Sequence, residues 1–139
     1  MTDLAVIECD HFYPHPPGAV WRALTEPELM AKWWVAGDIR PVVGHRFALD
    51  MGSWGVQECE VTVVEPERVL AYTYAEGVLD STLTWTLVGE GTGTRLFLEH
   101  SGLDRDTPLG KAAFHGMGAG WPGVLARIAD VLPEDAAAS

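Results

Sequence analysis

The chain has 139 residues, of which 47% are hydrophobic and 21% are charged, and this composition fits one globular domain with one core. Nine basic residues against 20 acidic ones give a net charge of −11, which repels phosphate backbones and anionic membranes, so neither nucleic acid nor a membrane is expected as a partner. No apolar run approaches the roughly 20 residues of a membrane span, and the acidic N-terminus lacks secretory-signal features, so we expect a cytoplasmic location.

The first predicted elements are a strand and a short helix. Residues 5–13 alternate between two faces, which is strand periodicity. One face carries Ala5, Ile7, Cys9, His11 and Tyr13. Pro16 and Pro17 are predicted to end the strand and to begin a helix that runs through Leu24, since proline is tolerated in the first turn of a helix.

A second short helix is predicted next, and it ends in two adjacent tryptophans. Thr25 and Glu28 have the spacing of a capping box, which predicts a helix to Trp34 with Leu29 and Trp33 packed inward. Neighbouring side chains on a helix point about 100° apart, so Trp33 and Trp34 cannot both be core. We predict Trp33 in the core and Trp34 at the rim of a binding site. The alternative is that both rings only close one end of the core.

Five further strands are predicted, separated by short turns. They lie near residues 44–51, 55–64, 69–75, 81–88 and 94–102. Leu83 and Trp85 alternate with threonines, and Leu98 and His100 alternate with Phe97 and other outward residues. One face of the sheet is therefore expected to be wet and the other to be covered.

A C-terminal helix is predicted to provide that cover. Apolar residues recur at three- and four-residue steps at Trp121, Val124, Leu125, Ile128 and Leu132. Four glycines and Pro122 within residues 114–123 predict a loose or kinked segment just before it. The predicted class is α+β with all helices on one side of the sheet, in a single domain (1–139) with an ordered core over about 5–132 and a short tail over 133–139.

Five segments in this order also resemble a known family. They read VWRALTEPELMAKWW, VVGHRFALDM, VTVVEPERVLAYTY, STLTWTLVGEGTGTRLFLEHSGL and GWPGVLARIADVL. The chain resembles the activator-of-heat-shock-protein-90-ATPase homologues of the START-like (SRPBCC, birch-pollen-allergen-like) superfamily. The resemblance implies a helix-grip fold, in which a curved, six-stranded antiparallel sheet wraps around a long C-terminal helix. It also implies two short helices between strands 1 and 2, and a deep cavity.

The covered face and the mouth of that cavity supply the predicted site residues. The covered face carries Phe47, Leu49, Met51, Tyr72, Tyr74, Leu83, Trp85, Leu98 and His100, and the mouth and the helix add Trp34, Trp54, Phe114, Met117, Trp121 and Leu125. This aromatic-rich composition with few polar groups is typical of a small-molecule pocket. We predict a binding protein for a hydrophobic or aromatic small molecule, with a fully packed interior as the alternative.

No catalytic group is visible in the sequence. Cys9 and Cys59 lie outside any CxxC motif, and the histidines lack metal-ligand spacing, so neither metal nor cofactor is expected. His11, His100 and His115 could converge on the cavity, where a single histidine satisfied by Tyr72 or by a backbone carbonyl is the simpler interpretation.

Three further roles stay open. Relatives in the superfamily include polyketide cyclases and aromatases, which would make His100, Tyr72 and His11 acid–base candidates. The family name suggests a chaperone partner, but the eukaryotic activators carry an additional domain that this sequence does not show, so such a partner is not expected. The exposed edge beside the first strand makes a homodimer possible.

Overall fold

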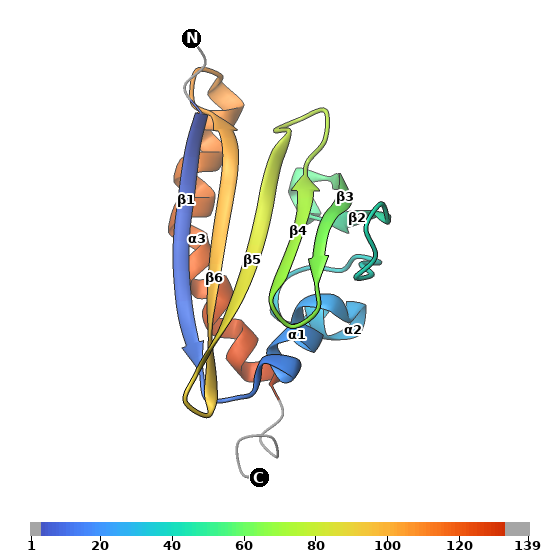
Figure 1. The fold of residues 1–139 in the computed structure, drawn as a ribbon. Coiled ribbons are helices and arrows are strands. Elements are labelled where there is room, and N and C mark those ends of the chain that lie inside the picture. Colours follow the sequence, from blue (N-terminus) through green and yellow to red (C-terminus); the bar gives the residue numbers. More distant parts are fainter. Residues whose placement is uncertain (1–3, 133–139) are drawn as a thin grey trace.

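Six strands form one antiparallel sheet, and three α-helices pack against it, in a computed structural model that describes residues 4–132 (Figure 1). The chain order is β1 (Leu4–Tyr13), α1 (Pro17–Thr25), α2 (Pro27–Trp33), β2 (Arg46–Asp50), the 3-10 turn η1 (Gly52–Trp54), β3 (Val56–Glu65), β4 (Val69–Tyr74), β5 (Ser81–Glu90), β6 (Gly93–Asp104) and α3 (Pro108–Val131). This confirms the predicted α+β class, the helix-grip fold and the order of the elements. The predicted tail, 133–139, lies outside the described residues.

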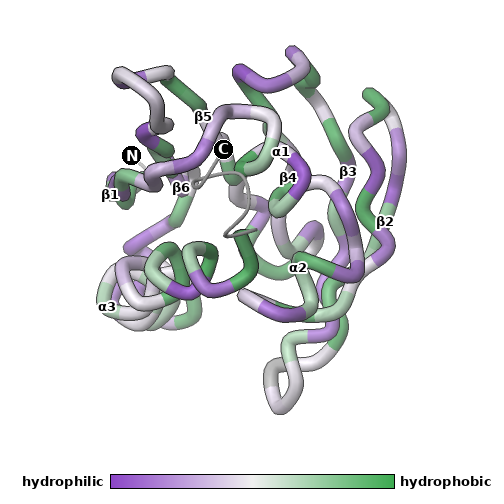
Figure 2. Tube along the Cα trace, turned by 90° about the horizontal axis from the view of Figure 1, so that it is seen from below, coloured by the Kyte–Doolittle hydropathy of each residue, from purple (hydrophilic) through white to green (hydrophobic). Residues whose placement is uncertain are grey.

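The strand order is β1-β6-β5-β4-β3-β2. Short turns place β2 to β6 side by side in chain order. The last strand, β6, also pairs with β1, so β1 and β2 form the two edges of the sheet. The strands make a curved row with α2 and α3 on one side of it (Figure 2). The helices thus cover the apolar face of the sheet, as the alternation of apolar and polar residues along the strands predicts.

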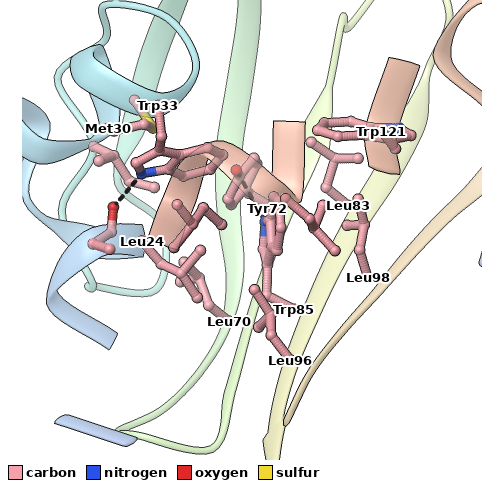
Figure 3. Close-up of a cluster of buried hydrophobic side chains, with 14 of the residues drawn as sticks. Leu24, Met30, Trp33, Leu70, Tyr72, Leu83, Trp85, Leu96, Leu98 and Trp121 are labelled. Carbon is pink, nitrogen blue, oxygen red and sulfur yellow. Dashed lines mark hydrogen bonds between the residues drawn. The ribbon is translucent and has the colours of Figure 1, made fainter. Parts of the chain in front are cut away.

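The alternation along β5 and β6 matches the observed burial. Leu83, Trp85 and Leu98 are buried toward the helices, whereas Phe97 and Glu99 are exposed on the other face. Three tryptophans, Trp33, Trp85 and Trp121, are among the largest fully buried side chains, and Figure 3 shows them gathered with leucines in one cluster. Burial of these aromatic and aliphatic side chains stabilises the fold.

The predicted capping box is wrong. Thr25 is the last residue of α1 and donates its hydroxyl back to the Trp21 carbonyl (2.9 Å), and Glu26, with extended backbone, is the N-cap of α2. A residue that is still helical cannot serve as the N-cap of the next helix, because that position needs extended φ and ψ. The inward residues of α2 are Met30 and Trp33, while Leu29 is only half-buried.

The C-terminal helix is much longer than its apolar repeat predicts. α3 is helical without interruption from Pro108 to Val131, through Pro122 and the glycines of the segment predicted to be loose. Thr107 caps it by accepting a hydrogen bond from the Gly110 N–H (3.0 Å). Gly110 sits so close to the Asp104 carbonyl that no side chain would fit. Tertiary contacts at both ends therefore outweigh the low helix propensity of the middle.

Candidate functional site

Most of the predicted pocket residues form the packed core. The buried ones are Phe47, Leu49, Tyr72, Tyr74, Leu83, Trp85, Leu98, His100, Trp121 and Leu125. Apart from the polar His100, they belong to one continuous hydrophobic cluster (Figure 3). In it, the Trp85 ring meets the Trp33 and Trp121 rings edge to face at centroid distances of 5.7 and 5.9 Å. Open space for a ligand therefore lies at the margin of this cluster.

An apolar groove of about 400 Å³ opens beside the core, between the first half of α3, the β4–β5 turn and the neighbouring ends of β2 and β3. It is lined by Met51, Gln57, Tyr74, Ala75, Val78, Leu79, Leu109, Ala112, Ala113, Gly116 and Met117. Three of the predicted site residues, Met51, Tyr74 and Met117, thus lie in the lining. We call this feature the apolar groove.

The helix wall of the groove follows from the periodicity of α3. The five helix residues in the lining stand at steps of three, four, seven and eight from Leu109, which places them on one face. Three of them, Ala112, Ala113 and Gly116, are small and so leave volume beside the helix. A Cβ atom added at Gly116 would meet no other atom within 4 Å.

The opposite wall is a tight turn between β4 and β5. The backbone N–H groups of Val78, Leu79 and Asp80 all donate to the Ala75 carbonyl, at 2.8 to 3.0 Å. Ala75 itself has a φ of 59°, a strained backbone for a residue with a side chain. The Asp80 carboxylate accepts from the Gly77 N–H at 2.7 Å. These bonds hold Val78 and Leu79 in place toward the groove.

The adjacent tryptophans have different environments. Trp33 is buried and donates its indole N–H to the Ala23 carbonyl (2.7 Å), whereas Trp34 is half-buried. The Trp34 ring stacks on Trp33 at 5.8 Å and lies 5.2 Å from the Trp121 ring and 6.1 Å from the Tyr74 ring. Through Tyr74, the Trp34 ring is one side chain removed from the groove.

His100 is the centre of a buried hydrogen-bond chain. The Trp121 indole donates to His100 Nδ1 (3.1 Å), so that nitrogen is unprotonated and Nε2–H donates to Ser81 Oγ (2.9 Å). The Ser81 hydroxyl in turn donates to the Tyr74 carbonyl (3.2 Å). Burial lowers the pKa of His100 to about 4, so the ring is neutral at pH 7. It is the satisfied histidine expected from the sequence, but its partners are Ser81 and Trp121 in place of Tyr72 or a backbone carbonyl.

The other acid–base candidates have separate environments. The His11 ring lies tilted against the Tyr13 ring of the edge strand, with 4.7 Å between the centroids, and His115 is exposed beside Phe114 on α3. The Tyr72 hydroxyl accepts the Trp85 indole N–H (3.1 Å), and burial raises its pKa. The three histidines do not meet in one site.

The remaining predicted residues are Phe114 and Trp54. Phe114 is half-buried under the Arg105 guanidinium, 5.3 Å from the ring centroid, and lies outside the groove lining. The Trp54 side chain is outside the described part of the structure. Across residues 4–132, no cluster of three or more His, Cys, Asp or Glu side chains could hold a metal ion. No helix in the same range is long and apolar enough to cross a membrane.

Sequence reasoning missed much of the groove lining, including Leu109, Ala112, Ala113 and the turn residues Val78 and Leu79. The helical spacing of the small and apolar residues from Leu109 onward was the available signal. The glycines and Pro122 obscured it, because they predict a break where the helix continues. The turn residues carry no comparable signal, since their approach to α3 depends on the register of β4 and β5.

Comparisons with known proteins agree with this architecture. The sequence signature described as Activator of Hsp90 ATPase homolog 1-like protein matches residues 14–133, and a search of curated proteins found no match. Among solved structures, protein MLL2253 of Mesorhizobium loti is 36% identical with a TM-score of 0.80, over 91% of this chain and 96% of that one. Protein BH1534 of Bacillus halodurans is 26% identical with a TM-score of 0.81, over 96% and 100%.

A more distant structure, the Aha1 dimer of Colwellia psychrerythraea, is 19% identical with a TM-score of 0.77, over 92% of this chain and 96% of that one. It shares the fold and is described as a dimer. The family signature covers most of the chain, and the relative from Mesorhizobium loti spans nearly all of it. The chain therefore belongs to the family of Activator of Hsp90 ATPase homolog 1-like proteins.

Proposed function

We propose that the protein binds a hydrophobic small molecule in the apolar groove. The observation that carries this proposal is the lining itself, in which all but one of the side chains are apolar or aromatic, around a volume of about 400 Å³. Ligand pockets in proteins are commonly of roughly 300–1,000 Å³ and mostly apolar. An open apolar concavity of this size costs free energy in water, so its presence beside a well-filled core favours a binding role.

Binding without catalysis fits the chemistry around the groove. His100 uses both ring nitrogens in hydrogen bonds and is buried. A general base has to reach its substrate directly or through one water. Tyr72 is buried against Trp85, and His11 lies on β1, so neither stands in the groove lining.

The experiment is a titration with the uncharged fluorophore N-phenyl-1-naphthylamine, whose emission rises in apolar surroundings. Gly116→Leu places a side chain into the groove, where an added Cβ meets open space. The matched control is Gly123→Leu, about 10 Å further along α3, where an added Cβ also meets open space and the residue is outside the lining.

We expect wild type and Gly123→Leu to bind the fluorophore with equal affinity and Gly116→Leu to bind at least about tenfold more weakly, because a leucine fills part of the volume. Both leucines should retain the fold, since each replaces a helical glycine. Equal binding by Gly116→Leu, or no binding by wild type across a panel of hydrophobic ligands, contradicts the proposal.

We also propose a homodimer formed through the edge strand β1. The strand has no partner on its outer side in the sheet order, and Leu4 and Val6 are exposed on it. Unpaired strand edges are surfaces for pairing between chains. Light scattering coupled to size-exclusion chromatography should give twice the mass of 15.1 kDa, and Val6→Pro should lower it to the monomer mass. A monomeric wild type contradicts this.

A further inference from the structure

We propose that the apolar groove is selective for uncharged or cationic aromatic molecules and rejects carboxylates and sulfonates of the same shape. This inference rests on the proposed function, since it concerns the ligand class of the same groove. It follows from where the charges of the chain lie relative to the lining.

The lining offers an anion no counter-charge. Among its described residues there is no Lys, Arg or His, and the polar side-chain groups are the Gln57 amide and the Tyr74 hydroxyl. Burial raises the pKa of Tyr74 to about 12, so its hydroxyl is neutral. An ionised group that leaves water without a partner is strongly disfavoured. A carboxylate or sulfonate would therefore bind only by keeping its charged end outside.

The basic side chains in the first half of α3 and on β2 point elsewhere or are already paired. Lys111 and His115 stand at helical positions roughly opposite to the groove face of α3, and both are exposed. On the sheet side, Arg46 lies between two carboxylates, at 2.5 Å from Glu60 and 2.9 Å from Glu76. These two carboxylates neutralise the Arg46 charge, and the Arg46 hydrogen bond lowers the pKa of Glu76.

Carboxylates stand at the sheet side of the groove. Asp80 is fixed in the β4–β5 turn by the Gly77 N–H (2.7 Å), immediately after the lining residue Leu79. Asp50 precedes the lining residue Met51 and accepts from the Gly52 N–H (3.1 Å). With a net charge of −11 on the whole chain, the field at this opening repels anions and attracts cations.

The apolar part of the lining favours an aromatic ligand. Met51 and Met117 supply thioether sulfurs, which make favourable contacts with aromatic rings, and the buried Tyr74 ring adds an aromatic wall. Methionine side chains also adapt their shape to the molecule they contact. Linked or fused rings are the ligand shape that this lining suits.

Two probes that differ in one charged group test the selectivity. N-phenyl-1-naphthylamine and 8-anilinonaphthalene-1-sulfonate share the same ring system, and the second adds a sulfonate. We expect the sulfonate probe to bind at least about tenfold more weakly, because its charge finds no partner in the groove. Equal affinities would overturn the selectivity and leave the binding function standing. Failure of the neutral probe and of the panel of hydrophobic ligands to bind would instead remove the proposed function.

A pair of matched variants tests whether the groove itself makes the choice. Val78→Lys puts a cation in the lining, and Val88→Lys puts one on β5 outside it; the two valines are 52% and 44% exposed. Both variants change the net charge equally. We expect Val78→Lys alone to tighten sulfonate binding relative to binding of the neutral probe, by about fivefold or more. Equal tightening in both variants would overturn the groove-based selectivity.

Discussion

The two halves of α3 have different roles, since one packs into the core and the other borders the apolar groove. Its second half, from Trp121 onward, contributes three buried side chains and is fastened to the rest of the fold by side-chain hydrogen bonds. These run from Trp121 to His100 (3.1 Å), from Tyr13 to the Leu125 carbonyl (2.6 Å) and from Arg127 to the Trp33 carbonyl (3.1 Å). In the first half, Gly110 is the buried residue, and one face borders the apolar groove. A single helix thus closes the core at one end and leaves it open at the other.

The difference shows how a small domain can offer an apolar opening and still be stable. Aromatic burial and hydrogen bonding are concentrated in the closed half, so the α3 residues that line the groove contribute little to the stability of the fold. Alanine and glycine fill the groove face of α3 without closing it. Loss of a closed-half contact should therefore cost stability, whereas loss of a groove contact should cost binding.

The largest expected effect is the contrast between Trp85→Ala and Leu109→Ala. Trp85 is fully buried and Leu109 is 42% exposed. We expect Trp85→Ala to lower the free energy of unfolding by about 3–5 kcal/mol, and Leu109→Ala by less than about 1 kcal/mol. Urea unfolding followed by circular dichroism gives both values. Similar losses for the two variants would erase the distinction between the halves.

Acidification should weaken the closed half through His100. Its pKa is about 4 in the folded protein against an ordinary 6.5, so the unfolded chain binds the proton more readily. The stability that this group contributes is complete above pH 6.5 and is lost as the pH falls toward 4, by about 3 kcal/mol in total.

The measurement is the difference in unfolding free energy between wild type and His100→Gln, at pH 7 and at pH 4.5. The variant keeps the carboxylates, so their common contribution to acid sensitivity cancels in the difference. The advantage of wild type should shrink at the lower pH. An advantage that is constant with pH would mean that His100 does not titrate as its burial requires.

A smaller loss is expected from Trp121→Phe. The change keeps an aromatic ring but removes the indole N–H, so His100 Nδ1 loses its donor in a buried place. An unsatisfied buried acceptor costs about 1–3 kcal/mol. Trp34→Phe serves as the control for lost ring volume at a half-buried position, and it should cost less. The reverse order would show that the hydrogen bond contributes little.

The smallest expected effect concerns the paired tryptophans. Trp34 contacts Tyr74, which lines the groove, while Trp33 lies behind it in the core. On addition of N-phenyl-1-naphthylamine, the indole N–H resonance of Trp34 should shift more than that of Trp33 in two-dimensional NMR spectra. The variants Trp33→Phe and Trp34→Phe assign the two signals by the resonance that each one removes. A larger shift for Trp33 would place the ligand inside the core.

The sheet could be predicted from the sequence because the alternation of buried and exposed residues along a strand is a local pattern. In β5, each alternate residue from Leu83 to Leu87 is buried, and no long-range knowledge is needed to see the pattern. Alternate residues are likewise buried in β6, and in α3 the buried residues from Trp121 onward recur at helical spacing. The family resemblance supplied the connectivity that alternation alone leaves open.

The groove could be predicted only in part, since it depends on packing between distant segments. Met51 and Tyr74 lie on the sheet face that the strand period defines, whereas Met117 was predicted only as a residue at the mouth of the cavity, in the segment expected to be loose. Local rules failed where tertiary contacts decide the outcome. Pro122 and the glycines predict a break that the anchors on both sides of it prevent, and Thr25 ends α1 where its spacing to Glu28 predicts a cap.

Hydrogen exchange read by mass spectrometry, with and without N-phenyl-1-naphthylamine, tests the division of α3 most directly. In the free protein, amides over 109–120 should exchange faster than those over 121–131, because few buried contacts hold them. The fluorophore should slow exchange over 109–117 and in the β4–β5 turn, with no change over 121–131. Uniform exchange along α3, or protection confined to 121–131, would contradict this account.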